Sequence, residues 1–223
     1  MSELFCVERV MGFCEKVCYF LVVNLLFIIS NIPVLLFLLF VGAGQIRECL
    51  PLFLLCLLPM APALSAVMYA MNRVVWGTEG KAFSDYRKGY FSGFRQKMEL
   101  GAGQLFVIFV CWTNMEFFSV QTGSLLLTVL FAVLFAAAVF ITPILYMLVS
   151  RYEMNNIQTV KAALTLLIAK PVFTLGNVAA LLLILGAFEI SAGTTVLFMG
   201  SIYGFLVMFM NRRLLQELEN NGN

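Results

Sequence analysis

The stretch LLLTVLFAVLFAAAVFITPILYMLVS, residues 125–150, contains no charged side chain and is followed at once by Arg151. An α-helix rises about 1.5 Å per residue, so about 20 apolar residues cross a bilayer core about 30 Å thick. The stretch is therefore long enough to span a membrane. Similar apolar runs precede and follow it, and together they predict six spans at residues 17–40, 52–72, 100–118, 125–150, 171–189 and 194–211.

The composition excludes an ordinary soluble protein. Of the 223 residues, 62% are hydrophobic and only 12% are charged, whereas about a quarter of a typical soluble domain is charged. No linker or polar segment is long enough to form a separate domain. We therefore expect an all-α membrane protein in which residues 1–223 form a single six-span membrane domain.

The basic residues predict which way the chain crosses the membrane. If the N-terminus is cytoplasmic, 13 of the 14 Lys and Arg residues fall on the cytoplasmic side, and only Arg47 falls on the far side. Short cytoplasmic loops carry an excess of Lys and Arg in membrane proteins. With an even number of spans, both termini lie on the same side. We expect N- and C-termini that are both cytoplasmic.

Two cytoplasmic connections, residues 83–98 and 156–169, have the pattern of amphipathic helices that lie on the membrane surface. Each predicted helix carries one cation within its apolar arc, Arg87 in the first and Lys161 in the second. Arg87 would either reach lipid phosphates or meet an acidic partner. The two arcs align at an offset of 74 residues, which predicts two related hairpins; the aligned residues are Phe83, Tyr86, Tyr90 and Phe94 with Ile157, Val160, Leu164 and Ile168.

Four residues inside the predicted spans have alternative interpretations. Pro59 and Pro62 should kink the second span, either as a hinge or binding site or simply to shape the helix. Asn24 and Asn31 lie on one face of the first span, where they could line a solute path or join helices by hydrogen bonds. The centres of the predicted spans carry no acidic or basic residue, which argues against an ion-driven transporter.

The sequence offers little for catalysis, metal binding or nucleic-acid binding. It contains no histidine and no paired C-x-x-C motif, so a zinc or haem site has little support. Intramembrane hydrolases need a Ser–His pair, paired aspartates or a metal. A net charge of +2 fits topology and lipid contacts better than nucleic-acid binding. We therefore expect no enzymatic activity, no cofactor and no nucleic-acid partner.

The chain contains five motifs that occur together: PALSAV from Pro62, FSDYRKGYFSGFRQK from Phe83, SRYEM from Ser150, TVKAAL from Thr159 and KPVFTL from Lys170. These motifs resemble the signature of the YesL-like family of bacterial multi-span membrane proteins. The resemblance runs from about residue 10 to residue 210. It implies a protein of the bacterial plasma membrane without an established biochemical activity. It also implies an association with carbohydrate uptake systems and sensor kinases.

These observations lead to one functional hypothesis and one alternative. The hypothesis is a non-enzymatic accessory protein whose cytoplasmic face docks a sugar permease or a sensor kinase through Arg73, Asp85, Arg87, Arg151, Tyr152 and Lys161. The alternative is a small-solute transporter or channel with a path lined by Asn24, Asn31, Pro59 and Pro62. The lipid bilayer is a partner in both. The sequence also leaves homo-oligomerisation as an alternative, because a G-x-x-x-G motif at Gly200 and Gly204 permits close helix packing within the fold or in a dimer.

Overall fold

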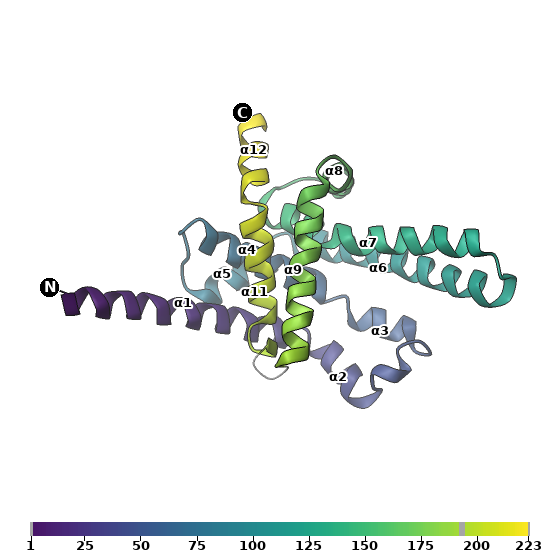
Figure 1. Ribbon diagram of the computed structural model, residues 1–223, viewed down its shortest axis with the longest axis horizontal. Helices are drawn as coiled ribbons and strands as arrows, with labels where there is room; N and C mark the ends of the chain where they lie inside the picture. Colours follow the sequence, from purple (N-terminus) through teal and green to yellow (C-terminus); the bar gives the residue numbers. More distant parts are fainter. Residues whose placement is uncertain (1, 192–194, 223) are drawn as a thin grey trace.

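The structure is a computed structural model that describes residues 2–191 and 195–222, and in this part of the chain every regular element is helical (Figure 1). In chain order the elements are α1 (Ser2–Ser30), α2 (Ile32–Phe40), η1 (Ala43–Gln45), α3 (Leu50–Cys56), α4 (Met60–Val75), α5 (Ala82–Phe91), α6 (Phe94–Phe117), η2 (Phe118–Thr122), α7 (Leu125–Arg151), α8 (Asn156–Ala169), α9 (Pro171–Ile190), α11 (Met199–Met210) and α12 (Arg212–Gly222). The predicted all-α fold is confirmed for the described residues.

Helix α4 lies at the centre of the fold. It packs against α1, α5, α6, α7 and α11. Half of its ten buried residues are alanine or serine, namely Ala61, Ala63, Ser65, Ala66 and Ala70. Small side chains allow helix backbones to approach closely, which is how helices associate where no hydrophobic effect drives them together.

The neighbours of α4 use glycine at the closest contacts. A Cβ atom added to Gly101 of α6 would lie 2.5 Å from Cβ of Ala61, and one added to Gly204 of α11 would lie 2.5 Å from Cγ1 of Val67. Both distances are far below a van der Waals contact. The backbones of α6 and α11 therefore pack directly on α4, and no larger residue fits without moving a helix.

The G-x-x-x-G motif of α11 is used inside the protein. Gly204 contacts α4, and a Cβ atom added to Gly200 would lie 2.9 Å from the Phe27 ring of α1. Both glycines are buried. The motif therefore packs α11 between α1 and α4, which makes it unavailable as the contact surface of a dimer.

Among the described residues, five stretches are long and apolar enough to cross a membrane: Met11–Ser30, Leu50–Val75, Phe94–Gln121, Leu125–Arg151 and Pro171–Ile190. They correspond to the first five predicted spans. The sixth, predicted at 194–211, coincides with α11, and residue 194 lies outside the described residues. Helix α11 has 12 residues and a length of about 18 Å, which is short for a bilayer core. The described residues thus contain five candidate spans, and the sixth predicted span stays a prediction.

Two of the predicted spans are interrupted. The run 17–40 divides at Asn31, where α1 ends and α2 begins, and the run 52–72 divides between α3 and α4. Proline follows each break, with Pro33 in the first turn of α2 and Pro59 directly before α4. Proline has no N–H to donate to the preceding turn, so it favours the start of a new helix over the continuation of the old one.

The predicted surface helix at 83–98 is wrong as a single element. Helix α5 ends at Phe91, Gly93 adopts a left-handed conformation with φ +60°, and α6 begins at Phe94. A left-handed glycine ends a helix at little conformational cost. The other predicted surface helix, 156–169, has the bounds of α8, whose N-terminus is capped by Asn155 and Gln158.

Connections that the sequence predicts on one side of the membrane meet in the structure. On the predicted far side, Arg47 beyond η1 forms an ion pair with Glu116 of α6. On the predicted cytoplasmic side, Gln96 donates a hydrogen bond to the Met154 carbonyl, and Asn156 donates one to Glu99 at 2.7 Å. The long helices are not all parallel: α6 and α7 run across Figure 1, whereas α9 and α11 run up it.

The close approach to α4 predicts a matched pair of variants. Gly101→Ala should lower the free energy of unfolding by about 1–3 kcal/mol, because the new methyl group overlaps Ala61. Gly103→Ala, on the same helix and with no atom within 4 Å of its added Cβ, should leave stability unchanged or raise it. Thermal unfolding of both variants in detergent measures the difference, and equal melting temperatures would contradict the packing described.

Candidate functional site

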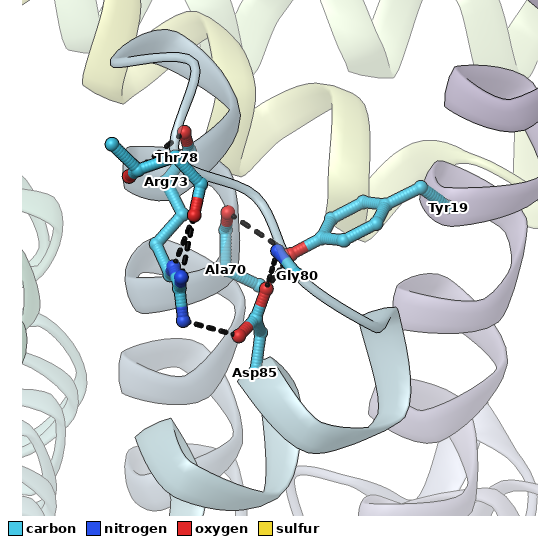
Figure 2. A network of polar contacts seen from close by, with 6 residues as sticks. All are labelled: Tyr19, Ala70, Arg73, Thr78, Gly80 and Asp85. Atoms are coloured by element: carbon cyan, nitrogen blue, oxygen red, sulfur yellow. Dashed lines mark hydrogen bonds and ion pairs between the residues drawn. The ribbon is translucent and has the colours of Figure 1, made fainter. Parts of the chain in front are cut away.

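Asp85, in the first turn of α5, is the centre of a polar network that joins three helices (Figure 2). Its side chain is only 3% exposed. Oδ1 forms an ion pair with Nη1 of Arg73 at 2.6 Å, and Oδ2 accepts hydrogen bonds from the Tyr19 hydroxyl at 2.9 Å and the Gly80 N–H at 2.8 Å. Three donors thus compensate a buried carboxylate, as a buried charge requires.

Arg73 fixes the loop that connects α4 to α5. Its Nε atom donates to the Thr78 carbonyl at 2.8 Å, and Nη2 donates to the same oxygen. The remaining nitrogen, Nη1, holds Asp85, so one guanidinium links the end of α4 to the loop and to α5. Tyr19 adds α1 to this arrangement. The network therefore links α1, α4, the α4–α5 loop and α5. Two of the six predicted docking residues, Arg73 and Asp85, belong to it.

Arg151 and Tyr152 lie at the end of α7, close to the end of α4. The Arg151 guanidinium lies 4.9 Å from the centre of the Trp76 ring and donates to Oδ1 of Asn72 at 3.0 Å. Arg212 lies 5.0 Å from the same ring. Tyr152 is half-buried, and its backbone N–H donates to the Leu148 carbonyl. Arg151 therefore joins α7 to α4 rather than projecting freely into solvent.

Arg87 is exposed, and so are the apolar side chains on either side of it. Phe83 and Phe91, one turn before and one turn after, are 58% and 64% exposed. The opposite side of α5 contains the buried residues Asp85 and Gly89. The helical periodicity of residues 83–98 assigns Asp85 to the polar face, opposite the apolar arc, and predicts that it points outward. This prediction is wrong, because Asp85 is buried in an ion pair with Arg73.

Lys161 has a matching environment on α8. It is exposed, and Ile157 and Ile168 on the same face are 66% and 79% exposed. The buried residues of α8 are Thr159 and Ala163. At the predicted offset of 74 these two correspond to the buried Asp85 and Gly89, so both helices turn small or polar residues inward. Arg87 and Lys161 point away from the core at equivalent positions.

The asparagines of the first predicted span bond to backbone. Asn24 donates from Nδ2 to the Val196 carbonyl at 2.7 Å and accepts at Oδ1 from the Gly200 N–H at 2.8 Å, so it fastens α1 to the start of α11. Asn31, between α1 and α2, donates to the Phe27 carbonyl in the last turn of α1. These contacts favour helix packing as the role of Asn24, because both ends of its amide are used.

The two prolines lie at the junction of α3 and α4. Pro59 immediately precedes α4, and Pro62 lies buried in its first turn. A proline in the first turn leaves no hydrogen bond unmade, since the first N–H groups of a helix have no partner within it. The predicted kink is therefore a complete break between two helices, and both prolines are compatible with an undistorted α4.

Several polar contacts could not be predicted from the sequence. Lys97 is 2% exposed and donates from Nζ to the Gly89 carbonyl near the end of α5. Asn211 donates to Asn177 at 2.7 Å between α11 and α9. The one available signal was the isolation of Asn177 within an apolar run, since a lone amide in a span usually bonds to another helix.

Tyr86 is a further buried polar group, although the helical periodicity of residues 83–98 assigns it to the apolar arc. Its hydroxyl donates to Oγ of Ser30 at 2.9 Å, which connects α5 to the end of α1. Burial raises the pKa of Tyr86, so the phenol keeps its proton and remains a hydrogen-bond donor at neutral pH. Together with Tyr19, it places two tyrosine contacts between α1 and the α4–α5 region.

Two clefts of ligand size lie on the surface of the described residues. The first, of about 500 Å³, lies between α1 and the α4–α5 loop. The second, of about 630 Å³, lies beside the Arg47–Glu116 pair. Asn24, Asn31, Pro59 and Pro62 line neither cleft. Within the described residues, no group of three or more His, Cys, Asp or Glu side chains could hold a metal ion.

No protein-family model, curated protein or solved structure matches this chain. Its function therefore has to be argued from its own residues. The contacts above divide the candidate residues into two groups: Arg73, Asp85, Arg151 and Asn24 join helices, whereas Arg87 and Lys161 face outward.

The network at Asp85 predicts a large loss of stability on substitution. Asp85→Asn removes the charge that compensates Arg73, and it should lower the free energy of unfolding by about 2–4 kcal/mol. Glu153→Gln, the same chemical change at an exposed position, should have little effect. Thermal unfolding and limited proteolysis of the α4–α5 loop would report the difference. A fully stable, protease-resistant Asp85→Asn protein would show that the network is dispensable.

Asn24 and Asn31 provide a second comparison. Asn24→Ala leaves the Gly200 N–H and the Val196 carbonyl unpaired, which should cost about 1–2 kcal/mol of unfolding free energy. Asn31→Ala removes only a bond to the preceding turn of the chain and should cost less. The melting temperatures of the two variants test this order. A reversed order would mean that Asn24 does not fasten α1 to α11.

Proposed function

We propose that this chain is a non-enzymatic accessory protein of the bacterial plasma membrane, with six spans and both termini in the cytoplasm. In this proposal it docks a membrane partner that takes up or senses carbohydrate, either a sugar permease or a sensor kinase. The class of partner rests on the resemblance of the sequence to the YesL-like family. The docking surface rests on the outward faces of α5 and α8.

The observation that carries the proposal is the equivalent placement of Arg87 and Lys161. Each cation is exposed and is surrounded by exposed apolar side chains on its own helix. Among the described residues, neither forms an ion pair with a carboxylate. On a helix at the membrane surface, such apolar side chains are covered by lipid or by a partner, and the proposal assigns the cations among them to a partner.

The two surfaces are held together by contacts at the start of α6. Gln96 and Glu99 of α6 bond to Met154 and Asn156 next to α8, so the α5–α6 corner and the N-terminal end of α8 are linked. A partner that contacts both would present acidic side chains flanked by apolar ones. Charge pairs that lose water at an interface contribute strongly to specificity, because the wrong sign of charge is rejected.

The alternative function, a small-solute transporter or channel, receives less support. Asn24 uses both ends of its amide to join α1 and α11, and the prolines begin a helix rather than bend one in mid-span. The residues that would line a path therefore have structural roles that explain their presence. We favour the accessory function for this reason.

Reversing the two outward charges tests the proposal. The double variant Arg87→Glu, Lys161→Glu should insert normally and keep its melting temperature, because neither side chain contributes to the core. It should co-purify with at least about tenfold less partner from crosslinked native membranes, because each reversal replaces an attraction with a repulsion. Quantitative mass spectrometry of the purified complex measures the loss.

Arg213→Glu is the matched control, since Arg213 is exposed on α12 and has no carboxylate partner among the described residues. This variant should retain its partner. If the double variant retains the partner as well as the wild type does, the α5–α8 surface is not the docking site. If the wild-type protein itself purifies without a stoichiometric partner, the accessory function is wrong.

A further inference from the structure

The cleft of about 630 Å³ lies at the end of α6 that is remote from the docking surface proposed above. One side of it is formed by α6, η2 and the first turn of α7, and the other by η1 and the residues up to Arg47. Glu99 of the docking corner and Glu116 of the cleft are about 25 Å apart along α6, at about 1.5 Å per residue. The volume is within the range of binding sites for small molecules.

The ion pair between Arg47 and Glu116 is the charged part of this cleft, and it leaves two groups unused. Nε and Nη2 of Arg47 both donate to the same oxygen, Oε1 of Glu116. Within the described residues, Oε2 of Glu116 accepts no hydrogen bond and Nη1 of Arg47 donates none. The side chains are 38% and 66% exposed, and Oε2 is open to solvent. The pair therefore presents an accessible acceptor next to an accessible donor.

Most of the remaining lining is apolar. Ile46 lies on the η1 side, and Met115 and Val120 lie on the side of α6 and η2. Trp112 is half-buried, and its ring centre lies 5.8 Å from that of Phe135 on α7, so the indole is held between two helices. Because a buried polar group without a partner is costly, these walls favour a ligand with an apolar part.

The polar groups are too few for a sugar. A sugar carries hydroxyl groups around its whole ring, and each needs a partner when it is buried. Beyond the ion pair, the side chains that line the cleft offer only the hydroxyls of Ser119 and Thr128, and Thr128 already donates to the Ser124 carbonyl at 3.0 Å. One arginine and one glutamate make the lining neutral overall. A compact zwitterion matches these charges.

We propose that this cleft binds an apolar α-amino acid. Its ammonium group pairs with Oε2 of Glu116, its carboxylate pairs with the guanidinium of Arg47, and its side chain lies against the apolar walls. The two charged groups of an α-amino acid are attached to one carbon, which suits a carboxylate and a guanidinium that touch each other. Hydrogen bonds between charged groups are about twice as strong as neutral ones.

The end of α6 supports this assignment. Beside the cleft, α6 passes into η2, which is a π-helical segment and contributes Ser119 and Val120 to the lining. Segments of π-helix are rare and occur frequently at functional sites. The site needs no protein partner, so it is tested on the purified protein alone, independently of the docking surface.

The first experiment identifies the ligand groups that are recognised. Isothermal titration calorimetry of the purified full-length protein in detergent compares L-phenylalanine with 3-phenylpropionate, which lacks the ammonium group, with phenethylamine, which lacks the carboxylate, and with L-serine, which lacks the apolar side chain. L-phenylalanine should bind at least about tenfold more tightly than each of the others. Failure of L-phenylalanine to bind, equal binding of any of the three analogues, or its displacement by glucose at the same concentration would overturn the proposal.

Glu116→Gln tests the acceptor. This variant should bind L-phenylalanine and 3-phenylpropionate equally, because a neutral amide does not attract the ammonium group. A substitution that merely displaced the η1 connection would weaken both ligands and keep the ratio of their affinities, so an unchanged ratio would refute the contact with Glu116. Exposed ion pairs contribute little to stability, so the melting temperature should stay at the wild-type value.

Glu48→Gln is the matched control, because Glu48 is exposed, directly follows Arg47 and does not line the cleft. It should bind L-phenylalanine as the wild type does, and it should keep the tenfold preference over 3-phenylpropionate. Loss of the preference in this variant as well would show that the charge of the connection, rather than Glu116, attracts the ligand.

The second experiment locates the ligand by fluorescence. The chain has two tryptophans, of which Trp112 lines the cleft and Trp76 does not. In the Trp76→Phe variant, L-leucine should change the emission of Trp112 with the affinity that calorimetry gives for the same ligand. Calorimetric binding of L-leucine without any change in Trp112 emission would place the amino acid elsewhere and overturn the assignment of this cleft.

Discussion

The fold depends on the close approach of several helices to α4. The buried surface of α4 is lined by alanine and serine, and α6 and α11 meet it with glycine. Each contact leaves no space for another methyl group, so the positions of the surrounding helices are fixed together. Where bilayer lipids are as apolar as the side chains, packing of this kind and buried hydrogen bonds supply most of the specificity.

The polar contacts then fix the C-terminal end of α4. Arg73 holds Asp85 of α5 through an ion pair, and the guanidinium groups of Arg151 and Arg212 lie 4.9 and 5.0 Å from the centre of the Trp76 ring. These interactions involve residues at helix ends, where the dielectric is higher and charges are less costly than in hydrocarbon. The outward cations Arg87 and Lys161 follow from this arrangement, because the opposite faces of α5 and α8 are committed to the core.

The sequence was a good guide to elements and a poorer guide to individual roles. Apolar length located the candidate spans, and periodicity gave the bounds of α8. It misplaced Asp85, because an amphipathic pattern assigns charged residues to the outer face and contains no information about a partner 12 residues earlier in the chain. It also treated Arg73 and Arg151 as free docking groups, although both are engaged at the end of α4.

By itself, the sequence determined that the chain is helical and apolar enough to cross a membrane, since both properties depend on local composition and length. It also predicted which connections lie on the same side of the membrane, and the contact of Arg47 with Glu116 joins two segments that were predicted on the same side. Only the tertiary structure decided which polar residues meet. Tyr19, Arg73 and Asp85 come from three helices, and the cleft beside them exists because those helices pack together. Contacts of this kind depend on the relative positions of distant segments, which no local pattern encodes.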